Sequence, residues 1–257
     1  MFELFDDDPI SRPLTYPGRI PAASGVLVDD AYVPLQPADS SPGEWRAAGE
    51  PLSTLLAHRG CRPLSARHHV VAVGSNAAPS QVRRKFLDHG VCPVVPMTLA
   101  DVPGVAPGVS AHVSRAGYVP AAPIDTPGET SRLFVLWLDE RQLAALDLTE
   151  PNYTRTTLAR PITLESGLRL PPAFVYTGKH GCLMDAGRRP RRLTPQRALI
   201  QSLLEETPGL SRLCGDTPDD FVATVRDETV RAAASRLLRA WPNTGVIGPS
   251  GRVGARD

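Results

Sequence analysis

Short apolar stretches separated by glycine and proline fill the middle of the chain, and this pattern predicts β-strands. They lie at residues 70–73, 94–99, 111–115, 133–138, 154–164 and 173–177. Short strands with few helices between them favour a sheet that curves back on itself. We therefore expect an α+β fold, built on a small mixed, closed or strongly curved β-barrel flanked by helices.

Two helical patterns lie among these strands. Pro79 suits the first position of a helix over 79–88, because proline lacks the N–H that a first helical turn leaves unpaired. In 139–149, leucines recur on one face, and two acidic residues stand in the first turn, where the helix dipole favours negative charge. We expect both helices to pack on the sheet.

The pattern changes before and after this region, which divides the chain into three parts. Residues 1–65 are rich in proline and turn residues and read as an N-terminal extension, with a hairpin at 24–33 and a short helix at 52–58. The barrel domain takes 66–182, and a C-terminal helical extension with its tail takes 183–257.

Helix signals dominate the last part. Thr194-Pro195 and Thr217-Pro218 each place a capping hydroxyl before a proline, which predicts a helix start. An apolar stripe at helical period runs from Phe221 to Trp241 and predicts a helix packed on another element. The glycine-rich segment 243–257 predicts a mobile tail.

The composition of the chain bears on which partners it binds and on where in the cell it acts. The 42% hydrophobic content supports a buried core, and a formal net charge of +1 gives no reason to expect nucleic acid as a partner. No apolar stretch has the length of a membrane span, and the acidic start is unlike a signal peptide, so we expect a cytoplasmic protein without a membrane partner. Near-absence of lysine is typical of a GC-rich bacterial coding sequence. The four cysteines are scattered, which predicts reduced, mostly buried thiols and no metal site.

The first candidate for chemistry is the loop Gly74-Ser75-Asn76, which follows the first strand of the predicted barrel. Glycine permits a tight turn, in which successive backbone N–H groups converge on an anionic or carbonyl oxygen. The side chains of Ser75 and Asn76 add further hydrogen bonds. Such a turn is more often purely structural, and that interpretation stays open.

The second candidate is Glu150, at the end of the second predicted helix. Pro151 turns it out of helical geometry, so its carboxylate is free to act as a general base. Asp147, one turn earlier, adds a second negative charge nearby. An exposed glutamate at a helix end is the structural alternative.

Taken together, these segments resemble the γ-glutamylcyclotransferase-like family over residues 68–180. The segments that carry the resemblance are Gly74-Ser75-Asn76, Gly117-Tyr118-Val119-Pro120-Ala121 leading to Pro127-Gly128, Leu146-Asp147-x-x-Glu150-x-x-Tyr153-x-Arg155, and Ala173-Phe174-Val175-Tyr176. The resemblance implies a β-barrel with its ligand at one mouth. It also implies cleavage of γ-glutamyl amides or amines, in which the glutamyl group cyclises to 5-oxoproline.

Carried over by position, the resemblance makes Glu150 the catalytic residue. It places Val73, Gly74, Ser75 and Asn76 around the substrate, and Tyr118, Tyr153 and Tyr176 are the aromatic candidates for the same pocket. Two positions depart from the family, which usually has tyrosine where Val73 stands and glycine where Pro151 stands. Either another tyrosine compensates for Val73, or the pocket serves a different ligand.

The expected function is therefore a cyclotransferase that needs no metal and no cofactor, with a small γ-glutamyl compound as its partner. Two alternatives stay open. The altered loop is compatible with a small-ligand or protein-binding module of the same fold, and Glu150 is compatible with an enzyme that processes another amide or acyl substrate. The sequence leaves a homo-oligomer open.

Overall fold

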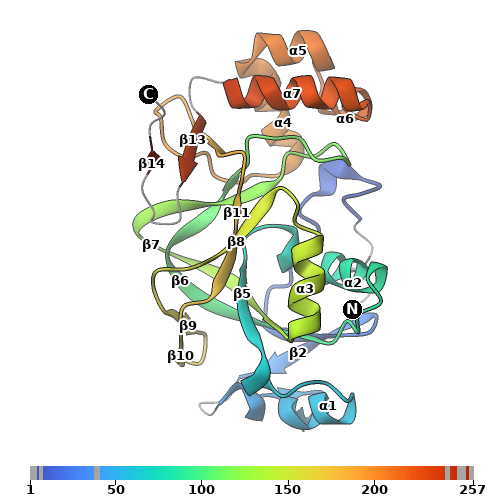
Figure 1. The fold of residues 1–257 in the computed structure, drawn as a ribbon, viewed down its shortest axis with the longest axis vertical. Helices are drawn as coiled ribbons and strands as arrows, with labels where there is room; N and C mark the ends of the chain where they lie inside the picture. Colours follow the sequence, from blue (N-terminus) through green and yellow to red (C-terminus); the bar gives the residue numbers. More distant parts are fainter. Residues whose placement is uncertain (1–4, 6–7, 38–40, 241–243, 248–252, 255–257) are drawn as a thin grey trace.

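One large mixed sheet with helices on its face and at its end forms the molecule (Figure 1). The structure, a computed structural model, describes residues 5, 8–37, 41–240, 244–247 and 253–254, with side chains described up to residue 240. Seven α-helices lie within these residues. The fold is thus α+β, as the sequence predicts.

The main sheet has eleven strands, and its longest path runs β4-β3-β2-β1-β6-β7-β5-β11-β8, with β9 on β6 and β10 on β9. Only β5 and β11 pair in parallel among the described strands; the other pairs are antiparallel. The strands are β1 (Gly25–Val28), β2 (Ala31–Gln36), β3 (Arg46–Ala47), β4 (Glu50–Pro51), β5 (His68–Ala72), β6 (Val95–Val109), β7 (Ala121–Leu138), β8 (Tyr153–Thr157), β9 (Ile162–Leu164), β10 (Arg169–Leu170) and β11 (Phe174–Gly178).

The pairing of the described strands does not close this sheet into a barrel, because its path ends at β4 and β8, which do not pair with one another, and the branch from β6 through β9 ends at β10. Segments of the first 65 residues form β1 to β4, and β1 pairs with β6 at Gly25 to Leu27. The predicted hairpin at 24–33 is therefore confirmed, and it extends the sheet.

Two strand predictions are wrong in extent. The stretches 94–99 and 133–138 are parts of two long strands, β6 and β7, which stay paired through several prolines. The register shifts between Pro103 and Val105, around Gly104 with φ +78°. A bulge of this kind lets a proline-bearing strand continue, whereas local pattern alone indicates a break.

A third strand prediction fails outright. Residues 111–115 are not a strand, because the Ser114 hydroxyl accepts hydrogen bonds from the amides of Gly117 and Tyr118 and closes a turn. The stretch 154–164 is two strands, since it is interrupted before Pro161, which has no N–H to donate to a ladder. The prediction for 173–177 is confirmed as β11.

The helix predicted in the N-terminal extension and the two predicted among the strands are confirmed. They are α1 (Leu52–His58), α2 (Pro79–Asp88) and α3 (Glu140–Leu148), and α3 begins with a capping box between Asp139 and Gln142. The helices α2 and α3 cover one face of the sheet (Figure 1). Their apolar sides join β5, β6 and β7 in a core that includes Phe86, Leu146 and Leu136.

The C-terminal part is helical as expected, with α4 (Gln196–Glu206), α5 (Pro208–Cys214), α6 (Pro218–Thr224) and α7 (Glu228–Ala240). Thr217 caps α6 through the amide of Asp220, as predicted, but Thr194 caps nothing because α4 begins after Pro195. The stripe that begins at Phe221 is two helices, since Asp227 accepts the amides of Thr229 and Val230 and starts α7 anew.

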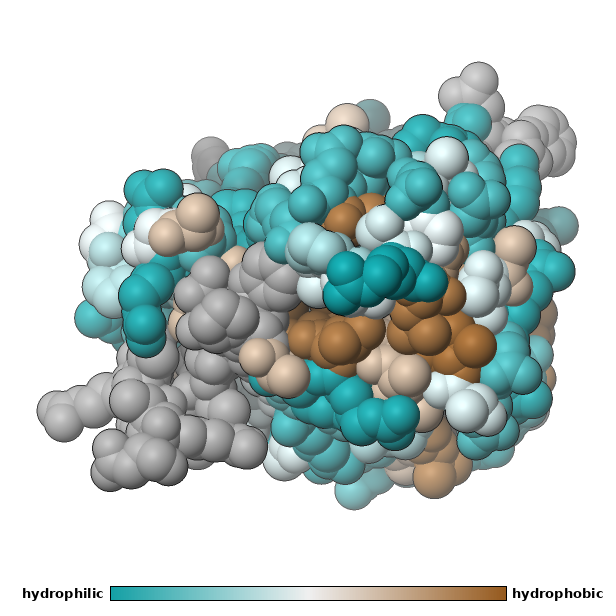
Figure 2. All heavy atoms as spheres, turned by 90° about the horizontal axis from the view of Figure 1, so that it is seen from above, coloured by the Kyte–Doolittle hydropathy of each residue, from teal (hydrophilic) through white to brown (hydrophobic). Residues whose placement is uncertain are grey.

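Trp241 lies outside the described residues. Of the predicted tail, the described parts are β13 (Thr244–Ile247) and β14 (Val253–Gly254), and β13 pairs with β12 (Cys182–Leu183). Figure 2 views the end that carries the C-terminal helices, where an apolar patch is bordered by hydrophilic side chains. Across the described residues, no helix combines the length and apolar composition needed to span a bilayer.

All four cysteines are free thiols, but only Cys182 and Cys214 are buried; Cys61 is half-buried and Cys92 is exposed. The expectation of reduced thiols agrees with this, and that of burial holds for two of them. Burial raises the pKa of Cys182 to about 12 and that of Cys214 to about 11.

The loop 110–120, between β6 and β7, is fastened to the C-terminal helices. The Gln196 side chain, fully buried at the start of α4, accepts from the Val119 amide at 2.9 Å and donates to the Val119 carbonyl at 2.8 Å. The Ser235 hydroxyl on α7 accepts from the Val113 amide at 3.0 Å. The C-terminal helices therefore fix the path of a loop that reaches the cavity described next.

Candidate active site

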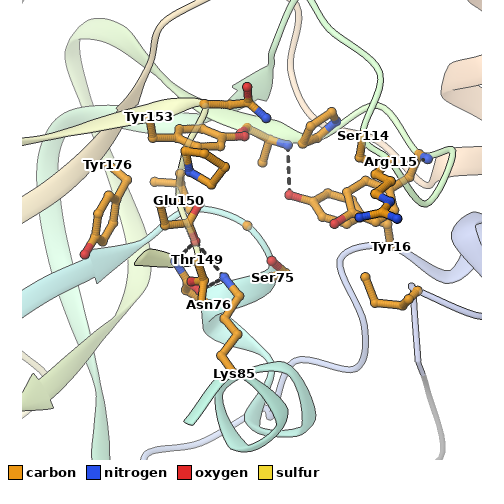
Figure 3. A pocket seen from close by; sticks show the side chains of 18 of the residues that line it. Tyr16, Ser75, Asn76, Lys85, Ser114, Arg115, Thr149, Glu150, Tyr153 and Tyr176 are labelled. Atoms are coloured by element: carbon orange, nitrogen blue, oxygen red, sulfur yellow. Dashed lines mark hydrogen bonds and ion pairs between the residues drawn. The ribbon is translucent and has the colours of Figure 1, made fainter. Parts of the chain in front are cut away.

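A cavity of about 310 Å³ opens between the ends of β5, α2 and α3, the loop 110–120 and the N-terminal segment. Every residue that the sequence singled out lines it: Val73, Gly74, Ser75, Asn76, Tyr118, Glu150, Tyr153 and Tyr176. Figure 3 shows Glu150 and Asn76 on one side and Tyr16 and Arg115 on the other.

The Gly74-Ser75-Asn76 loop follows β5 directly and forms a short 3-10 helix, η5 (Ser75–Ala77). Glycine is required at position 74 for steric reasons, because a Cβ there would stand 2.6 Å from the Tyr16 hydroxyl and 2.8 Å from the Ala121 Cβ. Within the described residues the amides of Gly74 and Asn76 make no backbone hydrogen bond. The nest interpretation of this loop stays a prediction.

Glu150 stands just after α3, whose C-cap is Thr149, and its side chain is only 11% exposed. Its Oε1 accepts from Asn76 Nδ2 at 3.0 Å and from Lys85 Nζ at 2.6 Å. Lys85 Nζ also donates to Asn76 Oδ1 at 2.8 Å, which closes a triangle of three side chains (Figure 3). Both hydrogen bonds go to Oε1, and Glu150 Oε2 has no protein partner in the described structure.

Lys85 was missed by the sequence analysis. It lies in the last turn of α2, and its side chain is 9% exposed, so its ammonium group is held inside the protein by Glu150 and Asn76. The chain has only two lysines, Lys85 and Lys179, among 28 basic residues. That rarity was the one available signal, since a lysine kept where arginine is the rule points to a compact point charge.

Asp147 does not act on Glu150 as the sequence suggested. Its carboxylate binds Arg155 at 2.7 Å and accepts from the Tyr176 hydroxyl at 2.8 Å. Tyr176 therefore lines the cavity with its ring while its hydroxyl points away from Glu150 (Figure 3). The charge nearest to Glu150 is the positive charge of Lys85.

Tyr16 is the second residue that sequence analysis missed, and it comes from the N-terminal segment. Its ring stacks on Tyr118 with centroids 4.2 Å apart, and its hydroxyl accepts from the Ala121 amide at 2.9 Å. The Ala121 carbonyl accepts from the Tyr153 hydroxyl at 2.7 Å. Tyr16 thus brings an aromatic ring and a hydroxyl beside the loop that follows Val73.

Burial keeps the phenols of the cavity neutral. It raises the pKa of Tyr16, Tyr118, Tyr153 and Tyr176, because the phenolate would lose its hydration. For Tyr176, the bonded Asp147 carboxylate raises the pKa further. These tyrosines are therefore hydrogen-bonding groups and walls of the cavity.

Two guanidinium groups complete the electrostatics of the cavity. Arg84 is paired with Asp88 at 3.2 Å, whereas Arg115, which is exposed, has no hydrogen bond or ion pair in the described part of the chain. Lys85 and Glu150 offset one another. The unpaired Arg115 therefore makes the cavity favourable for a ligand with a carboxylate.

Among the described residues, no three histidine, cysteine or acidic side chains gather as metal ligands would.

No protein-family model matches the sequence, and a search of curated proteins gives no match. The solved structures give matches. A protein named gamma-glutamyl cyclotransferase aligns with 12% identity and a TM-score of 0.38, over 66% of this chain and 99% of its own. The chain is similar to that protein in fold.

Two further solved structures also align with this chain. An AIG2-like protein from Mus musculus aligns with 21% identity and a TM-score of 0.31, over 44% of this chain and 78% of its own. A protein from Arabidopsis thaliana aligns with 16% identity and a TM-score of 0.37, over 58% of this chain and 89% of its own. At these values, an activity has to be argued from the residues of the cavity.

Proposed function

We propose that the protein is a γ-glutamyl cyclotransferase, which converts a γ-glutamyl amide or amine into 5-oxoproline and a free amine. The observation that carries this proposal is the anchored carboxylate of Glu150, which accepts from Asn76 of the Gly-Ser-Asn loop inside the cavity. A base and a loop with free N–H groups in one small enclosed site suit the folding of a short zwitterionic chain.

In the proposed reaction, Glu150 takes a proton from the α-ammonium group of the substrate. The amine then attacks its own γ-carbonyl carbon, the new N–C bond closes a five-membered ring, and the bond to the departing nitrogen breaks. Glu150 returns this proton to that nitrogen, and the ring nitrogen releases its second proton to the departing amine, which leaves as an ammonium ion. The protons therefore balance without a cofactor. Much of the acceleration comes from holding the chain folded, because ring closure within one molecule has a high effective concentration.

Other groups hold the substrate. The amides of Gly74 and Asn76 suit the α-carboxylate, and the ammonium group of Lys85 keeps Asn76 and Glu150 in place. Tyr16 and Tyr118 form an apolar wall for the methylene groups. Tyr16 supplies the ring and hydroxyl that a tyrosine at position 73 would otherwise provide. For this reason we favour an enzyme over a binding module.

The test is a mass-spectrometric screen for 5-oxoproline over γ-glutamyl amino acids, γ-glutamyl amines and γ-glutamyl peptides. N-acetylated versions of the same compounds are the matched controls, because they fit the cavity in part but have no free amine to attack. We expect release from at least one free compound and none from its acetylated form. Binding of a γ-glutamyl compound without any 5-oxoproline would leave the binding module as the better function.

A further inference from the structure

His112, a buried histidine that lines the same cavity, is hydrogen-bonded to the buried Ser110, and neither takes part in the proton transfer by Glu150. Ser110 Oγ lies 2.8 Å from His112 Nδ1, and the two residues are 0% and 4% exposed. His112 reaches the cavity wall, while Ser110 lies behind it. Building on the proposed function, we propose that His112 donates a hydrogen bond from Nε2–H to the γ-carbonyl oxygen of the substrate and stabilises the oxyanion that forms there.

The hydrogen bond with Ser110 fixes which nitrogen of His112 carries the proton. Within the described structure, His112 Nδ1 is the acceptor that the Ser110 hydroxyl reaches. A buried hydroxyl that donates to nothing is costly, so Ser110 donates and Nδ1 accepts. A neutral imidazole then carries its proton on Nε2. This atom has no protein partner, and unlike Nε2 of His69 it is not sealed inside the protein.

His112 stays neutral over the physiological range. Burial, the nearby His180 ring and the Arg239 guanidinium lower the pKa of His112 to about 3. Lys179 and Arg239 also face His180, whose own pKa is lowered first by burial, so the charges that act on the pair are positive. A neutral imidazole holds its proton firmly and polarises a carbonyl without giving the proton away, a role known for histidines in other enzymes.

The ring of His112 is held in place on several sides. The His180 ring lies 4.6 Å away, centroid to centroid, and His180 Nε2 is bound to Asn152 Oδ1 at 3.0 Å. The neighbouring Val113 amide is tied to Ser235 on α7. A donor whose direction is fixed before the reaction needs no reorganisation when charge develops, which is the condition for oxyanion stabilisation.

Tyr153 connects this donor with the base. Its ring lies 6.1 Å from that of His112, and its amide donates to the Glu150 carbonyl at 3.0 Å. His112 and Glu150 are thus both neighbours of Tyr153, and all three line one cavity of about 310 Å³. A glutamyl group with its amine at Glu150 has its γ-carbonyl a few bonds away, toward His112.

The experiment compares His112→Phe, which has no donor, with His112→Gln, which keeps an N–H, on a substrate that the native protein turns over. We expect kcat to fall roughly 10²- to 10³-fold in His112→Phe with a smaller change in KM, because one oxyanion donor is lost. His112→Gln should recover part of the loss. Ser110→Ala removes the hydrogen bond that selects the tautomer of His112, so its kcat should lie between those of the native protein and His112→Phe. His58→Phe, on an exposed side chain, is the surface control.

A second readout does not depend on activity. In ¹⁵N NMR of the imidazole groups, His112 should show a protonated Nε2 and a bare Nδ1, unchanged from pH 5 to pH 8, and its Nε2–H should shift when 5-oxoproline is added. An Nδ1–H tautomer, or full activity of His112→Phe, overturns the role of His112 and leaves the proposed function standing. A native protein that releases no 5-oxoproline overturns the proposed function itself, and the role of His112 with it.

Discussion

Lys85 Nζ lies 2.6 Å from Glu150 Oε1, although 65 positions separate the two residues in the chain. The base of the proposed reaction is therefore one half of a buried ion pair, and Asn76 contacts both halves. This arrangement links activity to stability, because a change in any of the three side chains leaves a polar group of another without its partner.

Glu150→Gln should show both effects. The amide cannot accept the amine proton, so we expect kcat to fall roughly 10²- to 10⁴-fold while binding of a γ-glutamyl compound changes far less. Loss of the charge beside Lys85 should also lower the free energy of unfolding, by about 1–3 kcal/mol. Steady-state kinetics and urea unfolding measure the two effects. Asp147→Asn, in the last turn of the preceding helix α3, is the control, and its activity should stay within a few-fold of native.

Lys85→Met should reduce stability and activity together, since the Glu150 carboxylate would lose its counter-charge in a partly enclosed site. In a double-mutant cycle with Glu150→Gln, the losses in unfolding free energy should not add, with a coupling of about 0.5–3 kcal/mol. Lys179→Met, which removes the other lysine from an exposed site bonded to the Pro151 carbonyl, is the matched control. Strict additivity would contradict the ion pair.

Gly74→Ala should destabilise the protein by about 1–3 kcal/mol, because the added methyl group meets the Tyr16 hydroxyl and Ala121 at distances that no real Cβ contact shows. Differential scanning calorimetry would measure the shift. Gly43→Ala is the control, since a Cβ there meets its nearest neighbour at an ordinary 3.6 Å. If the Tyr16 hydroxyl is the obstacle, Tyr16→Phe should lower the free energy of unfolding less in the Gly74→Ala variant than in the native protein.

The tyrosines give the protein an alkaline limit. Burial raises the pKa of all five above the ordinary value of 10: Tyr16, Tyr32, Tyr118, Tyr153 and Tyr176. A tyrosine whose pKa is higher in the folded than in the unfolded state stabilises the folded state. This contribution is fully present below the unfolded pKa of about 10, and it is lost as pH rises through the folded pKa. We expect stability to fall steadily above pH 10. Absorbance at 295 nm should show phenolate only as the chain unfolds; phenolate in the native protein at pH 10.5 would contradict the burial of these rings.

Gln196→Leu tests the fastening of the loop 110–120. The Val119 amide and carbonyl would lose their partners, so we expect a loss of about 1–3 kcal/mol in the free energy of unfolding and a raised KM, because Tyr118 and His112 lose their fixed positions. Gln201→Leu on the same helix is the control, since Gln201 bonds only to Glu205 and the Asp216 carbonyl. An unchanged KM in Gln196→Leu would mean that the loop holds its path without α4.

Local signals predicted much of this structure. Pro79 and the acidic turn at Asp139 and Glu140 gave α2 and α3 to within a residue, and the Gly74 loop and Glu150 do meet in one cavity. Each of these signals depends on residues a few positions apart, which is the range that propensity and capping describe.

What the sequence did not predict depends on contacts between distant segments. The long strands β6 and β7 contain prolines that argue against a strand, and only their mutual pairing with a bulge at Gly104 permits them. Tyr16 bonds to Ala121 across 105 positions, and Lys85 to Glu150 across 65. No periodicity connects such pairs, so local patterns could not place Tyr16 and Lys85 in the site.

The position of Tyr16 has a consequence for how this site varies among relatives. Under the proposed function, Tyr16 supplies from the N-terminal segment the ring and hydroxyl that the family resembled by the sequence has at the position of Val73. Substitutions at positions 16 and 73 should then be correlated in evolution: lineages with a tyrosine at 73 are free to lose Tyr16, and lineages with valine at 73 are not. An aligned set of relatives in which the two positions vary independently would show that the exchange of one tyrosine for the other never took place.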